Sequence, residues 1–474
     1  MSRTRKGNRM GKMMLLRWWN LVLVLGVSLG GLSSNRAADL TLPTAEQVVW
    51  SDMEIGLMIH FGPSTYEDTQ QDNCTVPMER INPAKLDTDQ WARVAELIGA
   101  KYIVLTAKHS GGFCIWPTKT TGYSIANTPW RGGKGDLVKE MAESCRKRGL
   151  KLGIYLSPAD KKHGAPLTWG TDWKGGQGHC ADPKQQPIYD DMYRRQLTEL
   201  LTGYGAVCEL WFDGSTETDI SDVLEKLAPK AIIVGSRWAN AHTSREDGFA
   251  PDPNWNVLSP QGGRWYVVEC PVPLRDTWFW FWNSRTDHML KSLDHLMTMY
   301  YHTVGRNANL LVSVGPDRDG LIPEIEVRQL SEFAYEVKRR FGRSVAEKSG
   351  RGETLELALQ GAPMRLDKAI ARKDGPAGDD RLLPVWQETP IVDHVMLMED
   401  IAQGQRVLEY VVEGLVGKEW KELSRGTSIG HKKIDRFIPV MCGKVRLRCT
   451  KSLAEPIIRR FAVFNTAWNS WEAP

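Results

Sequence analysis

The chain lacks the cysteine and histidine spacings from which protein metal sites are usually built. Its eight cysteines form no C-x-x-C pair, and none stands at zinc-ligand spacing from a histidine. We therefore expect no metal and no cofactor. Cys208 and Cys270 lie inside apolar, strand-like runs, which predicts buried thiols at both positions.

Internal repeats and low-complexity tracts are also missing, and no segment after residue 40 is apolar for long enough to span a bilayer. Hydrophobic residues make up 42% of the chain and charged residues 25%, which excludes a disordered protein. The net charge of +4 is carried partly by basic residues before residue 18, so it gives no reason to expect a nucleic-acid partner. The 474 residues suit a barrel of ordinary size followed by a smaller module.

The first forty residues have the pattern of a targeting segment. A basic stretch leads into the apolar run 21–32, and small residues follow at 33–34 and 37–38. We predict a signal peptide over residues 1–38, an exported protein (periplasmic or secreted) and no stable membrane insertion. A retained membrane anchor is the alternative, although the run is short for a spanning helix and rich in Gly and Ser.

Residues 39–345 alternate short apolar strands with amphipathic helices. The expected strands are Ile55–His60, Tyr102–Ala107, Leu152–Ser157, Val207–Phe212, Ala231–Val234, Trp265–Glu269 and Asn309–Val314. The expected helices are Asp89–Ile98, Gly135–Arg148, Pro187–Thr202, Ser221–Ala228, Leu290–Arg306 and Pro323–Arg340. This alternation implies parallel pairing, and the number of units favours an α/β fold of the (β/α)8 barrel type.

In residues 346–474 the sequence pattern changes to strands separated by turn signals. The expected strands are Asp393–Glu399, Gln405–Glu413, Lys444–Thr450 and Ile457–Phe464, and Ala371–Asp380 is predicted to be an exposed loop. We predict a C-terminal antiparallel β-sandwich.

Polar residues end several of the expected barrel strands, at the rim where barrel enzymes place their working groups. His60, His109, Tyr155, Asp213 and Glu269 all stand at such positions. Glycosidic cleavage needs side chains of these types, because one carboxylate must stabilise or attack the sugar centre while a second carboxyl protonates the leaving oxygen. Polar residues at strand ends can equally be structural, so position alone leaves both interpretations open.

Several long motifs, in order, resemble those of glycoside hydrolase family 29, the α-L-fucosidases. They are Gly56–Pro63, Leu105–His109, Gly112–Trp116, Gly149–Pro158, Glu209–Gly214, Leu310–Pro316 and, in the expected sandwich, Gly426–Lys432. The resemblance covers nearly everything after residue 45. It implies a retaining, exo-acting α-L-fucosidase that removes terminal fucose from oligosaccharides or glycoconjugates through a covalent glycosyl-enzyme intermediate.

The resemblance also implies the roles of individual residues. The nucleophile of the family is the aspartate of the motif E-L-W-x-D-G, which is Asp213 here. The acid/base is expected at Glu269, because Trp265–Glu269 followed by Pro273–Trp280 matches the layout of one family branch, and Glu246 is the alternative. The residues expected to bind the sugar are His60, His109, Tyr155, Trp211 and Arg237. The histidines could instead be core imidazoles, and Trp211 could be barrel packing.

Three departures from the family pattern leave the sugar preference open. His109 is followed by Ser110-Gly111 instead of histidine and aspartate, Ala159 stands in place of a tryptophan, and 67–73 lacks the usual tryptophan-glycine loop. A pocket that loses a hydrogen bond to one hydroxyl discriminates differently between sugars. The alternatives are therefore a related pyranosidase, for instance one acting on α-L-galactosides, and a catalytically silent carbohydrate-binding protein. The alternating Trp278, Trp280 and Trp282 could stack on an aglycone sugar or pack in the core.

Overall fold

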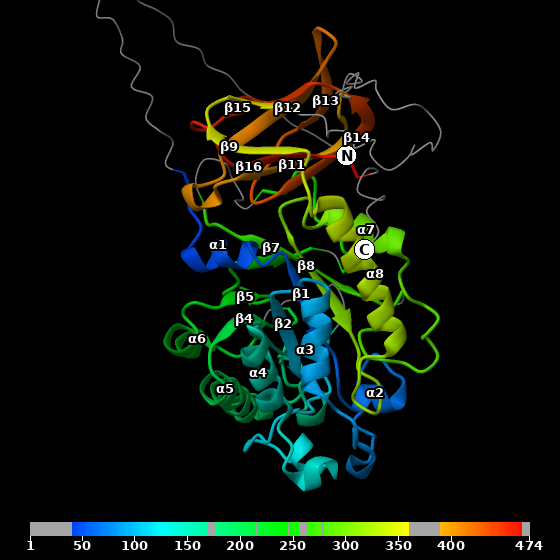
Figure 1. Ribbon diagram of the computed structural model, residues 1–474. Helices are drawn as coiled ribbons and strands as arrows, with labels where there is room; N and C mark the ends of the chain where they lie inside the picture. Colours follow the sequence, from blue (N-terminus) through cyan, green and yellow to red (C-terminus); the bar gives the residue numbers. More distant parts are fainter. Residues whose placement is uncertain are drawn as a thin grey trace, which may run out of the picture. The chain divides into compact units, whose positions relative to one another are not determined.

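A closed barrel of parallel strands forms the first part of the protein (Figure 1). The computed structural model describes residues 40–168, 177–214, 216–244, 246–255, 263–276, 279–359 and 389–466. The barrel strands, in order around the barrel, are β1 (Ile55–Ile59), β2 (Tyr102–Lys108), β3 (Lys151–Leu156), β4 (Val207–Trp211), β5 (Ile232–Val234), β6 (Ala241–Thr243), β7 (Val267–Pro273) and β8 (Asn309–Val314). Strand β8 pairs with β1 and closes the ring, which confirms the predicted (β/α)8-like fold.

Helices follow most of these strands and cover the outside of the barrel. Within the described residues they are α1 (Ala45–Ser51), α2 (Pro63–Glu67), α3 (Thr88–Leu97), α4 (Leu137–Arg148), α5 (Gln186–Gly203), α6 (Ser221–Leu227), α7 (Leu293–His302) and α8 (Glu324–Phe341). Every helix expected from the sequence is present, with its ends moved by a few residues. Helix α1 precedes the barrel and lies at its amino-terminal end, where the carbonyl oxygen of Trp50 accepts a hydrogen bond of 2.9 Å from Asn309 Nδ2.

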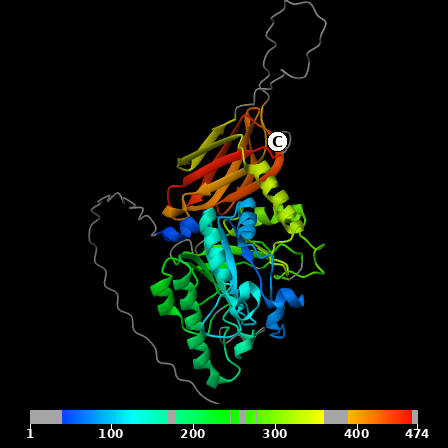
Figure 2. The same ribbon diagram turned by 60° about the horizontal axis from the view of Figure 1, so that its bottom comes forward.

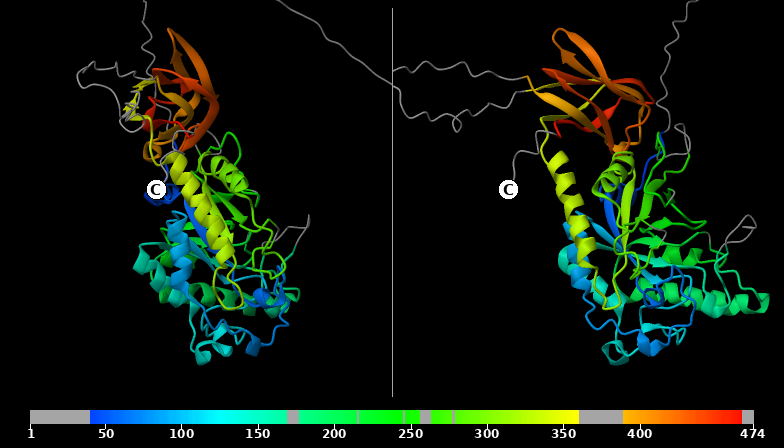
Figure 3. Two further views of the ribbon diagram at one scale, coloured as in Figure 1. Left: turned by 45° about the vertical axis from the view of Figure 1, so that its right-hand side comes forward. Right: turned by 90° about the vertical axis from the view of Figure 1, so that its right-hand side faces the viewer.

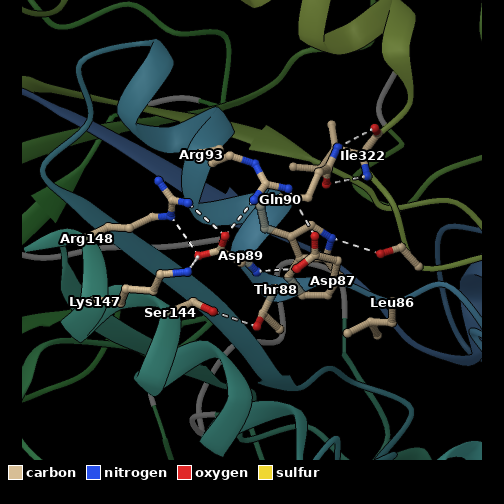
Figure 4. Close-up of polar contacts among 12 residues, drawn as sticks. Leu86, Asp87, Thr88, Asp89, Gln90, Arg93, Ser144, Lys147, Arg148 and Ile322 are labelled. Carbon is tan, nitrogen blue, oxygen red and sulfur yellow. Dashed lines mark hydrogen bonds and ion pairs between the residues drawn. The ribbon is translucent and has the colours of Figure 1, made fainter.

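Polar side chains join the neighbouring helices α3 and α4, as Figure 4 shows. The side chain of Asp87 caps α3 by accepting from the backbone N–H of Asp89 at 2.9 Å. The Asp89 carboxylate in turn accepts from Arg148 Nη2 at 2.7 Å, and the hydroxyls of Thr88 and Ser144 are 2.8 Å apart. The start of α3 and the end of α4 are therefore held together by capping and charge as well as by packing.

Strand β7 extends beyond the end expected from the sequence. It continues through Pro271 to Pro273, so Glu269 is its third residue instead of its last. Its neighbour β6 ends at Thr243, opposite Glu269, and the rest of β7 pairs with β8 alone. A strand that is hydrogen-bonded along one side only can contain prolines, because their missing N–H groups need no partner on the open side.

The second part of the protein consists of two four-stranded antiparallel sheets, which confirms the predicted β-sandwich (Figure 2). One sheet has the order β10 (Thr354–Ala358), β15 (Lys444–Ser452), β12 (Val407–Val416), β13 (Glu419–Gly426). The other has the order β14 (Lys433–Met441), β11 (Ile391–Glu399), β16 (Ile457–Phe464), β9 (Ala346–Arg351). Figure 3 shows α8 leading directly into β9. Apolar side chains from both sheets form a core of their own that includes Val395, Tyr410 and Phe461.

The four sandwich strands expected from the sequence are the four central strands, and the four that were not expected are the edge strands. Strands β9 and β13 carry charged and half-exposed residues along their length, so they lack a clear alternating apolar pattern. Charge on edge strands prevents pairing with other chains, and it also hides these strands from an analysis based on hydrophobic periodicity.

Some features predicted from the sequence lie outside the described residues, and others concern the chain as a whole. The predicted signal segment, the predicted loop 371–380 and Trp278 lie outside the described residues. All eight cysteines are free thiols; Cys270 is buried and Cys208 is half-buried. In the described ranges no helix has the length and apolar character needed to cross a membrane. The same ranges contain no group of three His, Cys, Asp or Glu side chains arranged to hold a metal ion.

A buried ion pair supports the loop that carries His109. Lys108 Nζ lies 3.1 Å from Asp160 Oδ2, and neither side chain is accessible to solvent. Burial alone would raise the pKa of Asp160, but Lys108 and His163 outweigh it and lower that pKa. The backbone N–H groups of Lys161 and Lys162, which follow Asp160, donate to the carbonyls of the Ser110-Gly111 turn.

Substituting Lys108 should therefore destabilise the protein strongly. Lys108→Met leaves the Asp160 carboxylate buried with His163 as its remaining side-chain partner, and we expect the free energy of unfolding to fall by about 3 kcal/mol or more. The double variant Lys108→Met/Asp160→Asn removes both charges and should recover much of the loss. Urea-induced unfolding of the three proteins measures both effects, and equal stability of the single variant and the wild type would contradict the prediction.

Candidate active site

A cavity of about 200 Å³ opens at the carboxyl-terminal ends of the barrel strands. His60 follows β1, His109 follows β2, Asp213 follows β4 and Trp280 follows β7, and all four side chains line it. The cavity therefore lies at the rim where (β/α)8 enzymes carry out their chemistry. The remaining lining residues are Met58, Gln70, Gln71, Tyr155, Leu167, Trp211, Glu246 and Pro271.

Aromatic rings form one continuous wall of this cavity. The Tyr155 ring lies between His109 and Trp211, stacked on both with centroid separations of 5.7 and 5.5 Å. His60 contacts Tyr155 by its edge, at 5.9 Å, and lies 5.4 Å from the Trp280 ring. Such a wall offers apolar faces to a sugar ring and keeps the polar groups between its members in fixed positions.

The two histidines of the cavity are held in their neutral form. His60 Nδ1 lies 3.0 Å from Ser313 Oγ, and His109 Nδ1 lies 3.1 Å from Ser110 Oγ. Burial lowers the pKa of His109 to about 4, and burial together with the repulsion between the two rings when both are protonated lowers the pKa of His60 well below its ordinary value. Each ring is thus oriented through Nδ1 and can exchange hydrogen bonds with sugar hydroxyls without carrying charge.

Asp213 presents its carboxylate to the cavity from the end of β4. The hydroxyl of Tyr155 donates a hydrogen bond of 3.0 Å to Asp213 Oδ2. Burial raises the pKa of Asp213, and the hydrogen bond from Tyr155 partly opposes that increase. The side chain is therefore a positioned carboxylate that is less well solvated than one on the surface, as a nucleophile requires.

Glu246 is the second carboxyl group of the cavity. It lies three residues after β6, and its side chain lines the same space as Asp213. Burial raises the pKa of Glu246, and the negative charge of Asp213 raises it further. The cavity thus combines an aspartate with a glutamate whose acidity depends on the charge of that aspartate, which is the pairing that general acid catalysis needs.

Glu269, the acid/base expected from the sequence, does not meet Asp213 in this cavity. Its side chain is completely buried near the start of β7, below the cavity floor. Glu269 Oε1 accepts from the Tyr102 hydroxyl at 2.6 Å, and Oε2 accepts from Trp211 Nε1 at 2.9 Å. The expected role is not compatible with this position, because an acid/base must reach the leaving oxygen of the substrate. The physical reason is the unexpected length of β7, which puts Glu269 in the barrel interior and not at its rim.

Arg237 is likewise outside the site in which the resemblance had put it. Its side chain is exposed, with Cζ 4.4 Å from the centre of the Trp238 ring and Nη2 3.4 Å from the carbonyl oxygen of Glu217. It is not among the residues that line the cavity. His60, His109, Tyr155 and Trp211 do line it, and their binding to the sugar stays a prediction.

The glutamines of the cavity wall were not expected from the sequence. Gln70 Oε1 accepts a hydrogen bond of 2.8 Å from the backbone N–H of Trp280, and Gln71 lines the cavity beside it. The signal was the segment 67–73 itself, which departs from the family pattern and could have been interpreted as a wall with its own chemistry. The sequence allowed two roles for Trp280, stacking on a sugar or packing in the core. In the structure its ring borders the cavity.

The departures after His109 have local structural explanations. Ser110 Oγ is the hydrogen-bond partner of His109, so the residue that replaces an imidazole orients the remaining one. A Cβ on Gly111 would lie 2.4 Å from the side chain of Asp72, and Gly112 has a φ of +98° and lies against Asp160. Bulkier residues at these two positions would force the loop away from its neighbours.

Comparison with known proteins identifies the family. The α-L-fucosidase family model matches residues 61–339. Alpha-L-fucosidase 1 of Arabidopsis thaliana is 28% identical over 90% of this chain and 88% of its own length. The crystal structure of a glycoside hydrolase 29 family member from an unknown rumen bacterium has a TM-score of 0.75 at 28% identity, covering 90% of this chain and 78% of that one. The closed barrel, the polar rim and the match over more than half of the sequence agree, and the chain belongs to the α-L-fucosidases of glycoside hydrolase family 29.

Proposed function

We propose that this hydrolase is a retaining, exo-acting α-L-fucosidase in which Asp213 is the nucleophile and Glu246 is the acid/base. The observation that carries the proposal is that these two carboxyl groups line one small cavity at the rim of the barrel. At about 200 Å³, the cavity is smaller than the roughly 300–1,000 Å³ pockets of drug-sized ligands, which suits one terminal sugar and not the interior of a chain. Terminal fucosyl groups of oligosaccharides or glycoconjugates are the substrates we expect.

The proposed reaction has two steps. In the first, Asp213 attacks the anomeric carbon while Glu246 gives its proton to the leaving glycosidic oxygen, so that a covalent glycosyl-enzyme forms and the aglycone alcohol departs. In the second, Glu246 takes a proton from water, and the resulting hydroxide displaces Asp213. Fucose is released with its original configuration, and both carboxyl groups return to their starting state.

The electrostatic coupling of the two groups supports this assignment. Burial and the charge of Asp213 raise the pKa of Glu246, which favours the protonated form needed in the first step. Once Asp213 is esterified, its charge is gone and the pKa of Glu246 must fall. Glu246 then becomes the base that the second step requires.

Replacing Asp213 should abolish turnover, and added azide should restore part of it. Asp213→Gly is expected to lower kcat on an aryl α-L-fucoside by roughly 10⁴-fold or more, because no covalent intermediate can form. Azide can enter the vacated space and displace the aglycone directly, giving β-L-fucosyl azide, which product analysis by NMR identifies. Near-wild-type activity of Asp213→Gly would contradict the assignment.

A wild-type protein that turned over an α-L-galactoside but no fucoside would instead favour the related pyranosidase, and one that binds sugar without any turnover would favour the silent binding protein.

Replacing Glu246 should have an effect that depends on the leaving group and on pH. Glu246→Gln is expected to lower kcat/KM by about 10²- to 10⁴-fold on a fucoside with a poor leaving group and much less on an activated aryl fucoside. In the wild type, activity should fall as pH rises through the raised pKa of Glu246 and as pH falls through the raised pKa of Asp213. The variant should lose the alkaline limb and keep the acid limb. An unchanged alkaline limb would assign the acid role to another group.

We also propose that residues 1–38 direct export and are removed. The basic stretch, apolar run and small residues before residue 39 support this proposal. Expression of the full sequence in a bacterial host should yield protein outside the cytoplasm, with a new N-terminus near residues 33–39 that N-terminal sequencing identifies. Leu23→Arg/Leu25→Arg, which interrupts the apolar run, should leave the uncut chain inside the cell. Recovery of the intact wild-type N-terminus in the membrane fraction would favour the retained anchor.

A further inference from the structure

A second pair of carboxyl groups lies inside the barrel, beneath the cavity. Glu209 of β4 and Glu269 of β7 are both completely buried. Trp50 Nε1 donates to Glu209 Oε2 at 2.7 Å, and Tyr102 donates to Glu269 Oε1 at 2.6 Å. Neither glutamate lines the cavity, so the proposed reaction uses neither of them.

The two glutamates are close enough to influence each other's protonation. Glu209 Oε1 is buried and has no hydrogen-bond partner among the described residues, while its carboxyl group interacts with that of Glu269. Two carboxylates cannot hydrogen-bond to each other unless one of them is protonated. Burial and the charge of Glu269 raise the pKa of Glu209 well above its ordinary value, and burial raises the pKa of Glu269 to about 6. The larger effect at Glu209 favours it as the protonated member, with Glu269 as the carboxylate that accepts.

Glu269 is connected to the nucleophile through two aromatic side chains. Its Oε2 accepts from Trp211 Nε1 at 2.9 Å, and the other side of Trp211 borders the cavity. The Trp211 ring stacks on Tyr155 at 5.5 Å with an angle of 21° between the planes. Tyr155 donates at 3.0 Å to Asp213 Oδ2. An unbroken chain of direct contacts, through Trp211 and Tyr155, therefore joins Glu269 to Asp213.

We infer that Glu269 is a positioning residue for this site, which fixes the indole of Trp211 and through it the Tyr155–Asp213 hydrogen bond. The inference rests on the proposed role of Asp213 as nucleophile. The carboxylate of Glu269 is needed because it accepts from three donors at once: the Tyr102 hydroxyl, the Trp211 N–H and the Glu209 acid. A buried N–H without an acceptor is costly, so the indole keeps this orientation only while Glu269 keeps its charge.

The two glutamates provide a matched pair of variants. Glu269→Gln replaces one accepting oxygen by an NH₂ group that faces a donor, so at least one of the three donors loses its acceptor. Glu209→Gln has the shape and the hydrogen-bonding pattern of the protonated acid, because its NH₂ group donates to Glu269 and its oxygen accepts from Trp50. We expect Glu209→Gln to retain kcat/KM within about threefold and Glu269→Gln to lose about 10- to 100-fold, as is usual when a group that orients an active residue is removed.

The experiment compares kcat/KM of these variants on an activated and on a poorly activated aryl α-L-fucoside, with and without azide. Glu269→Gln should lower both values by the same factor and should not respond to azide, because proton transfer by Glu246 is intact. Trp211→Phe, which removes the indole N–H, should cause a similar loss. The double variant should be no worse than Trp211→Phe alone, because both changes interrupt the same contact.

Each other outcome contradicts the inference. A loss in Glu269→Gln that is confined to the poor leaving group and is rescued by azide as α-L-fucosyl azide would make Glu269 the acid/base. Losses that multiply in the double variant would mean that Glu269 acts by another route, and a loss in Glu209→Gln equal to that in Glu269→Gln would overturn the assignment of Glu209 as the protonated member. If Glu269→Gln does not fold, unchanged kcat/KM in Trp211→Phe would still overturn the inference. Failure of the proposed function is a separate result, visible as absent fucoside turnover in the wild type or absent azide rescue in Asp213→Gly.

Discussion

The pairing of β1 with β8 is the constraint on which the rest of the protein depends. Residues 55–59 lie in register with 310–314, and this ladder closes a sheet whose other strands are consecutive in sequence. All eight strands are parallel, so closure brings all of their carboxyl ends to one rim. His60 and Asp213, which are 153 positions apart in the sequence, thereby line one cavity. Without the last ladder the same side chains would be spread along the edge of an open sheet.

The barrel contains two pairs of carboxyl groups, which lie at different depths and therefore in different chemical environments. Asp213 and Glu246 lie at the rim, where both line the cavity and where the charge of Asp213 raises the pKa of Glu246. Glu209 and Glu269 lie among indole and phenol groups in the interior, where hydrogen bonds from Trp50, Tyr102 and Trp211 make burial tolerable. Trp211 belongs to both environments, with its N–H in the lower pair and its ring in the cavity.

Some of the polar residues at the cavity depart from the pattern that the sequence otherwise shares with the family. Gln70 and Gln71 occupy a segment where a tryptophan-glycine loop was expected, and Gln70 fixes the backbone of Trp280. Ser110 replaces an imidazole and orients His109. The two carboxyl groups and the aromatic rings of the cavity are thus present, while some of the polar groups beside them depart from the family pattern. A pocket altered in this way can keep its reaction and differ in the sugar or linkage that it prefers.

Much of the architecture was predictable because it is encoded locally. Seven barrel strands, six helices and the four central sandwich strands follow from hydrophobic periodicity, since their side chains are buried in a regular pattern. Asp213 was predictable for the same reason, because the apolar run of β4 ends directly before it. The short β6 and the charged edge strands of the sandwich carry little of this signal, and they emerged only from their pairing with neighbours.

Sequence motifs were enough to predict the family, the barrel and the position of Asp213. The strand lengths of the folded barrel place Glu246, and not Glu269, in the cavity with Asp213. Glu269 follows an apolar run, as a rim residue should, yet the rim is defined by where the neighbouring strands end, and β7 continues beside β8 for four more residues. Glu246 follows the three-residue β6, which has almost no pattern of its own, but it reaches the cavity because that strand ends early. The depth of a side chain in a barrel is a property of all the strands together, and no single segment encodes it.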